Sequence, residues 1–464
     1  MPNSFAYLML GLWPIVTLAM FRFWPKERAF VWSLLGAYLF LPPPPAAFDL
    51  PMMPPLTKES LPSLVTFLVV WARFGRPALL PSTMAGRVLA AIFVLSPIAT
   101  VLTNPEPVVF GRIWIQSLGL KDMVALVVLQ FILLLPLLMA RRVLASPEGQ
   151  REVLLGLFVG GLIYSLPMLL EVRLSPQLNI WIYGYFQHSF EQMMRDGGFR
   201  PIVFLYHGLW VAFFCMTSVC AGLALSRSGV GHRKRVLYLA GAAYLLAVLV
   251  LCKSLGSLLL GAVAMPIILL LPRRTQLRAA ALIALVAIGY PVLKGADLIP
   301  VEWMLSEAAQ VDPDRAASLR FRFDNEDTLM ERAMEKPLFG WGSWGRNHIM
   351  HPITGEILTV TDGRWIILIG VFGWAGYLAE FGLLALPILM LWRDAGRAPR
   401  GSFTPYLGPM AVLLAINIVD MLPNATLTPL TWMLAGALLG YAEHLRGLRV
   451  PNRQPLLLRW RSVM

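Results

Sequence analysis

The chain has 464 residues, of which 57% are hydrophobic and 14% charged, with a net charge of +13 and a mean hydropathy of +0.66. Soluble domains are about 45–50% apolar and about 25% charged, so this composition excludes a soluble domain and a disordered chain. The three cysteines, Cys215, Cys220 and Cys252, all lie in apolar runs, which excludes a secreted disulfide scaffold. The composition therefore indicates an integral membrane protein with many spans.

Thirteen apolar segments are long enough, or nearly long enough, to cross a bilayer, which takes about 20 residues. In chain order they are 5–23, 29–42, 60–73, 86–103, 122–140, 152–170, 202–225, 236–252, 254–271, 279–296, 365–392, 405–422 and 429–445. The second and third are short and are separated by a run of prolines, so we expect about 12–13 spans. The sequence thus predicts an all-α polytopic membrane protein.

Positive charge is distributed unevenly over the connections between these segments. The connections on one side and the C-terminal tail carry 24 of the 39 Lys and Arg residues but only 5 of the 26 acidic residues. Because cytoplasmic loops are rich in Lys and Arg, we expect the N-terminus outside and the C-terminus in the cytoplasm. The basic charge then reflects topology, and we expect no nucleic-acid partner.

The same pattern divides the chain into membrane parts and outer-side loops. We expect N-terminal spans over 1–170, an outer loop over 171–201, central spans over 202–296, a large outer loop over 297–364, C-terminal spans over 365–445 and a basic cytoplasmic tail over 446–464. In the large loop, Asp324 to Asp327 has the acidic character of a helix start, and Pro337 is expected to stop that helix.

Three cationic candidates lie on the expected outer side before the large loop. Arg200 stands at the mouth of a span, where a guanidinium can grip a phosphate or simply anchor the helix at the lipid headgroups. His207 is expected about two turns inside that span, either as a functional group or as a neutral packing histidine. Lys253 lies in a tight turn between two spans, either adding a cation to a phosphate site or serving as an ordinary turn residue.

The large loop supplies the remaining candidates. Arg320 and Arg322 share one face if the segment around them is extended, and they either form an anion site or pair with nearby acidic residues. Asp362 and Arg364 come immediately before the eleventh span. Asp362 is a candidate general base, or alternatively a helix cap, and Arg364 a candidate anion ligand.

Several of these residues lie in short motifs with a familiar order. The run Glu335-Lys336-Pro337-Leu338-Phe339-Gly340-Trp341-Gly342, preceded by Arg322 and a helix, resembles the signature region of the O-antigen ligase and Wzy-type polymerase superfamily. Arg200 with His207-Gly208, and Lys253-Ser254-Leu255-Gly256, resemble two earlier elements of that superfamily, so the resemblance covers roughly 195–390. Asp362 stands where the family has a histidine tied to the ligase reaction, and this departure favours a polymerase.

The resemblance implies a GT-C-like helical fold and a metal-independent glycosyltransferase of the bacterial inner membrane, with its N-terminus periplasmic and with no cofactor. The donor would be a glycan on undecaprenyl diphosphate, the acceptor another glycan or lipid-linked glycan, and other polysaccharide-assembly proteins would be further partners. Polymerisation of exopolysaccharide or O-antigen repeats is the first expectation. The alternatives are ligation of the glycan to lipid A core and transport of a polysaccharide or lipid. The expected catalytic residues are Asp362, Arg200 and Arg322, and the expected substrate-binding residues are Arg200, Lys253, Arg320, Arg322, Arg364 and His207.

Overall fold

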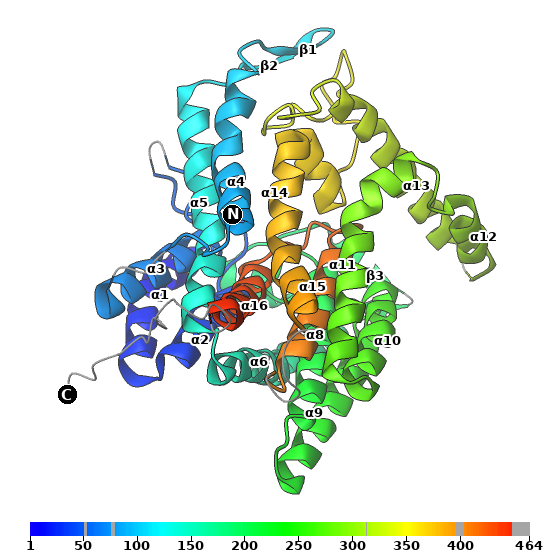
Figure 1. The fold of residues 1–464 in the computed structure, drawn as a ribbon. Helices are drawn as coiled ribbons and strands as arrows, with labels where there is room; N and C mark the ends of the chain where they lie inside the picture. Colours follow the sequence, from blue (N-terminus) through cyan, green and yellow to red (C-terminus); the bar gives the residue numbers. More distant parts are fainter. Residues whose placement is uncertain (51–52, 76–78, 196, 312, 396–402, 448–464) are drawn as a thin grey trace.

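The structure is a computed structural model that describes the chain except for residues 51–52, 76–78, 196, 312, 396–402 and 448–464. The described part consists of sixteen α-helices, one 3-10 helix and two hairpins of very short strands (Figure 1). The basic tail predicted over 446–464 lies outside the described residues from 448 onward.

The elements follow the predicted segments closely. In the first half the helices are α1 (Ser4–Phe23), α2 (Lys26–Phe40), α3 (Ser60–Phe74), α4 (Met84–Leu102), α5 (Leu120–Val143), α6 (Pro147–Leu174), α7 (Leu178–Tyr183) and α8 (Gly208–Ser226). In the second half they are α9 (His232–Leu251), α10 (Leu255–Leu270), α11 (Arg273–Gly295), α12 (Val301–Val311), α13 (Pro313–Met334), α14 (Arg364–Ala395), α15 (Leu407–Asp420) and α16 (Pro429–Gly447). The 3-10 helix is Glu191–Met193, and the antiparallel hairpins are β1 (Val108–Phe110) with β2 (Ile113–Ile115) and β3 (Met194–Arg195) with β4 (Gly198–Phe199). A helix occupies each of the thirteen segments predicted to be spans.

Eight of the described helices are at least 18 residues long and apolar enough to cross a membrane. They are α1, α4, α5, α6, α8, α9, α11 and α14, and α3, α10 and α15 are shorter apolar helices. The prediction of an all-α polytopic membrane protein is therefore confirmed at this level.

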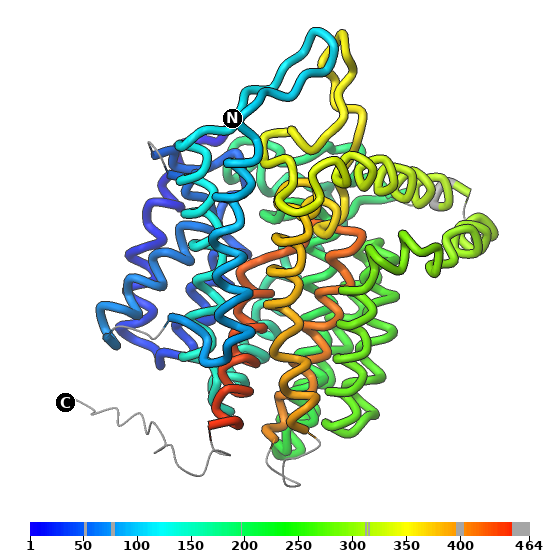
Figure 2. The backbone as a smooth tube through the Cα atoms, turned by 45° about the horizontal axis from the view of Figure 1, so that its top comes forward, coloured from blue at the N-terminus to red at the C-terminus, as the bar shows by residue number. Residues whose placement is uncertain are grey.

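The apolar helices stand side by side in one bundle (Figure 2). Inside it, α5 packs against α16, α8 against α9 and α11 against α15. α8 is buried over almost its whole length, since its many Gly, Ala and Ser residues let neighbouring helices approach closely. α1 instead exposes Leu8, Leu12 and Ile15, an apolar surface that indicates contact with a lipid bilayer.

The longest connections gather at the end of the bundle where the β1–β2 hairpin stands, which we call the loop end (Figure 2). There α12 and α13 form an arm that projects sideways from the bundle. The prediction that Asp324 begins a helix is wrong, because Asp324 lies inside α13. The segment around Arg320 and Arg322 is helical, so the condition under which these arginines would share the face of an extended segment is not met. The physical reason is that Pro313 suits the first turn of a helix and no Gly or Pro interrupts the chain again until Pro337.

Candidate functional site

The segment before α8, which we expected to form its first turns, is irregular. Buried Glu171 on α6 accepts backbone hydrogen bonds from Ile202 at 2.8 Å and from Val203 at 2.7 Å, so these amides are satisfied outside a helix. The prediction that His207 lies inside a span is therefore wrong. His207 is the N-cap of α8, and its Nδ1 accepts a hydrogen bond from the Leu209 amide at 3.0 Å.

Arg200 and Lys253 meet at the loop end. Arg200 is only 7% exposed, and its Nη2 donates to the carbonyl oxygen of Lys253 at 3.0 Å. Lys253 Nζ in turn donates to the carbonyl oxygen of Arg195 at 2.8 Å. Two glycines make this arrangement possible, because a Cβ on Gly198 would collide with Lys253 Nζ and one on Gly208 would collide with the Arg200 side chain. The hairpin β3–β4 and the start of α8 thus fix both cations.

His207 lies among positive charges. Its ring packs edge-on against His188, with ring centroids 4.6 Å apart. Burial, together with the charges of His188, Arg200, Arg322 and Arg195, lowers the pKa of His207 to about 3. His207 is therefore a neutral hydrogen-bonding group at physiological pH, and its surroundings form a local cation cluster.

Arg322 reaches this cluster from α13, whereas Arg320 does not. Arg322 Nε lies 3.2 Å from Asp362 Oδ2, and both side chains are partly exposed. Arg320 Nη2 lies 3.2 Å from Glu302 Oε2 on α12, where both side chains are well exposed. Because exposed pairs contribute about 0–1 kcal/mol, the Arg320 pair is a minor contact within the arm.

Arg364 is held by Glu380 on the same helix. Its Nε donates to Oε1 at 2.7 Å and its Nη2 to Oε2 at 2.6 Å, and Glu380 is completely buried. Sixteen residues of straight helix would place these residues about 24 Å apart. They meet because α14 is broken at Gly373, where φ is +67° and ψ is −169°. The first part of α14 is therefore a half-helix folded back beside the rest.

Gly373 is also where the signature turn around Gly340 docks. The Trp374 amide donates to the carbonyl oxygen of Pro337 at 2.8 Å. Gly340 and Gly373 both have positive φ, and a Cβ on either would collide with the backbone of the other segment. The glycines of the motif thus permit a close contact between backbones.

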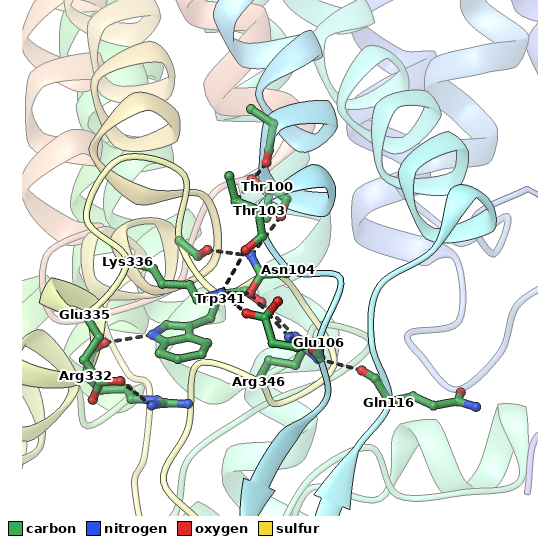
Figure 3. A network of polar contacts seen from close by, with 12 residues as sticks. Thr100, Thr103, Asn104, Glu106, Gln116, Arg332, Glu335, Lys336, Trp341 and Arg346 are labelled. Carbon is green, nitrogen blue, oxygen red and sulfur yellow. Dashed lines mark hydrogen bonds and ion pairs between the residues drawn. The ribbon is translucent and has the colours of Figure 1, made fainter.

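A polar network fastens the same turn to the segment that follows α4 (Figure 3). Lys336 Nζ lies 2.7 Å from Glu106 Oε1, and Asn104 Nδ2 donates to the carbonyl oxygen of Gly340 at 2.9 Å. Arg346 is fully buried and donates to the carbonyl oxygen of Glu106 at 2.9 Å. These side chains anchor the large loop, and so position Arg322 and Asp362.

Sequence reasoning missed two charged residues at the loop end, Lys58 and Glu59. Lys58 is 1% exposed, and its Nζ donates to the carbonyl oxygen of Phe204 at 2.7 Å. Burial lowers the pKa of Lys58 and raises that of Glu59, each to about 7. A side-chain hydrogen bond joins Glu59 to Tyr206, next to His207. The available signal was two adjacent charges directly before an apolar helix.

The structure therefore brings together most of the predicted site residues: Arg200, His207, Lys253, Arg322 and Asp362. Arg364 lies close to Asp362 in the chain but faces Glu380, and Arg320 lies on the arm. The sequence matches no known family model and none of the curated proteins, so the arrangement of these side chains carries the functional argument.

Proposed function

We propose that this chain is a membrane glycosyltransferase that joins undecaprenyl-diphosphate-linked oligosaccharide repeats into exopolysaccharide or O-antigen. The observation that carries the proposal is the group of cations at one end of an apolar bundle, namely Arg195, Arg200, Lys253 and Arg322. A lipid-linked donor has its chain in the bilayer and its diphosphate at the interface. Cations gathered at the end of membrane-spanning helices suit that diphosphate.

The chemistry requires charge stabilisation at this place. A hydroxyl of the acceptor attacks the anomeric carbon of the donor sugar, the bond from that carbon to the phosphate oxygen breaks, and undecaprenyl diphosphate leaves with the bonding electrons. Cations placed beforehand stabilise the developing negative charge, and Arg200 and Arg322 can each form two parallel hydrogen bonds to phosphate oxygens. The diphosphate already activates the donor, so the transfer requires no nucleotide and no metal.

The proposal includes the finer features of fold and location. We place the loop end in the periplasm and the basic connections in the cytoplasm of a bacterial inner membrane, with about 12–13 spans in a GT-C-like arrangement. The positive-inside charge distribution supports this orientation. Asp362, the base expected from the sequence, forms an ion pair with Arg322 that keeps it beside the cations.

A reconstituted reaction tests the proposal. The purified chain in lipid nanodiscs is mixed with undecaprenyl-diphosphate-linked repeats extracted from cells that lack it, and the products are separated by length. We expect a ladder of longer lipid-linked glycans, and we expect Arg200→Ala to abolish it while Arg112→Ala, in the exposed β1–β2 turn, keeps it. Transfer only to added lipid A core would indicate a ligase. Movement of lipid-linked glycan across the membrane without a new glycosidic bond would indicate a transporter.

A further inference from the structure

A cavity of about 110 Å³ lies beside the start of α14. Its lining residues come from the N-terminal end of α3, from α5, from α14, from the connection before α16 and from α16 itself: Glu59, Ser63, Leu133, Arg364, Ala425, Leu427, Thr428, Pro429 and Trp432. A single water needs about 10–15 Å³ of such volume, so the cavity has room for several waters or for a polar group of a ligand. Glu59 and Arg364 are its charged lining residues.

Glu59 presents an unused acceptor at this cavity. Within the described part of the chain, no residue donates a hydrogen bond to its buried Oε1. A buried carboxylate oxygen without a donor is costly, and a ligand hydroxyl would satisfy it. Asp362 differs in this respect, because the Arg322 guanidinium already engages it at 3.2 Å.

Two short stretches of backbone connect residues at this cavity with residues of the cation cluster. Tyr206, which hydrogen-bonds Glu59, is followed directly by His207 of the cluster. Arg364 lines the cavity, and Asp362, two residues earlier in the chain, pairs with Arg322 of the cluster. At the loop end, the cation cluster and the Glu59 carboxylate are therefore neighbours.

A second, smaller cavity adjoins the first and shares Thr428 with it. Its lining combines polar or amphipathic side chains with apolar ones: Tyr38, Trp210, Thr217, Asn417, Thr426 and Thr431 together with Leu157, Phe213, Phe214, Leu430 and Leu434. Hydroxyl and amide groups exchange hydrogen bonds with sugar hydroxyls, and aromatic rings cover the apolar face of a sugar ring. Together the cavities offer both hydrogen-bonding groups and apolar walls, a combination that suits a sugar.

We propose that these adjoining cavities bind the acceptor sugar and that Glu59 is the catalytic base that takes the proton from its attacking hydroxyl. This inference rests on the proposed transfer reaction. The hydroxyl oxygen forms the new bond to the anomeric carbon, its proton passes to Glu59 Oε1, and undecaprenyl diphosphate leaves toward the cations. Asp362 is then a positioning residue that orients Arg322.

The ionisation of Glu59 suits this role. Burial raises its pKa to about 7, against the opposing charges of Lys58 and Arg364 and the hydrogen bond from Tyr206. The titratable groups around it are Lys58, Tyr38, Tyr206, Arg364 and, beyond Tyr38, Asp420. A general base is most effective when its pKa is near the working pH, and the carboxylate form increases as pH rises through 7.

Three substitutions of Glu59 test the proposal in the reconstituted reaction. We expect Glu59→Gln to lower kcat by about 100-fold or more while donor binding changes little, because a positioned base contributes about 10²–10⁴-fold. Glu59→Asp should keep part of the activity. The acidic limb of the wild-type pH profile, near pH 7, should disappear in Glu59→Gln. Glu302→Gln, an exposed carboxylate on the arm, is the matched control and should retain both rate and limb.

Two further measurements separate catalysis from folding. Formate should restore part of the activity of Glu59→Ala, since the small carboxylate can occupy the enlarged cavity. Lys58→Met should move the acidic limb to higher pH, because it removes a charge that lowers the pKa of Glu59. If the wild-type protein is active and Glu59→Gln is equally active, Glu59 is not the base. The same conclusion follows if formate restores no activity to Glu59→Ala and Lys58→Met leaves the acidic limb of the pH profile in place. Either result would leave the proposed function standing. A wild-type protein that forms no glycosidic bond would overturn the proposed function instead.

Discussion

Replacing Glu380 by Gln tests the fold of α14, because it removes the charge that holds Arg364. The two side chains form two hydrogen bonds of 2.6 and 2.7 Å, and Glu380 is completely buried. With charge centres about 4 Å apart and an effective dielectric constant of about 20, their attraction is about 4 kcal/mol. Loss of one partner of a buried pair costs about 3–5 kcal/mol. The Arg364 side chain is 20% exposed, so we expect a loss of about 3 kcal/mol, at the low end of that range.

The free energy of unfolding can be measured in mixed micelles with a denaturing detergent, followed by tryptophan fluorescence. A double variant, Arg364→Met with Glu380→Met, should be more stable than Glu380→Gln alone, because no charge is left buried without a partner. Glu302→Gln should stay within about 0.5 kcal/mol of the wild type. If Glu380→Gln also stayed within that margin, the half-helix would not fold back as described.

Four further outcomes are expected. Arg200→Lys should restore only part of the polymer ladder that Arg200→Ala loses, because lysine cannot make the bidentate phosphate contact; a full ladder from Arg200→Ala would exclude Arg200 from the donor site. Asp362→Asn should raise the donor KM and leave kcat nearly unchanged, since Arg322 loses its charged partner; a collapse of kcat at constant donor KM would return the role of base to Asp362. Gly373→Ala should destabilise the protein by about 1–3 kcal/mol in the same unfolding assay, because its φ is +67° and a Cβ would strike the signature turn; unchanged stability would contradict that contact. In intact spheroplasts, a membrane-impermeant thiol reagent should label Ser343→Cys, whereas labelling only after the membrane is opened would reverse the proposed orientation.

The helices themselves were predictable from the sequence because a bilayer imposes length and composition on whatever crosses it. α4 and α5 follow from apolar runs of about 20 residues, and their boundaries agree with the predicted segments within a few residues. The charged connections predict which loops share a side of the membrane, and this orientation stays a prediction. These signals are local, so a single sequence contains them.

The wrong predictions concern segments whose backbone conformation depends on residues far away in the sequence. The residues from 202 onward are apolar, yet hydrogen bonds from their amides to Glu171 on another helix keep Ile202 and Val203 out of α8. Likewise, hydropathy alone predicts one span over 365–392, whereas a positive φ at Gly373 divides it. The glycines on either side of that break were visible in the sequence, but the partner segment that requires them lies more than thirty residues upstream.

Short stretches of backbone connect the cation cluster with the cavity that contains Glu59, and they keep the proposed base apart from the cations. Tyr206 and His207 are consecutive, so one faces the Glu59 carboxylate while the next faces the cations. A transfer reaction needs this separation, because a base beside the cations would be neutralised by them and would lose its affinity for a proton. Glu59 avoids this loss because burial outweighs the charges of Lys58 and Arg364 and keeps its pKa raised, at about 7. Burial therefore maintains the basicity of Glu59, while the Arg364–Glu380 pair supports the fold of α14.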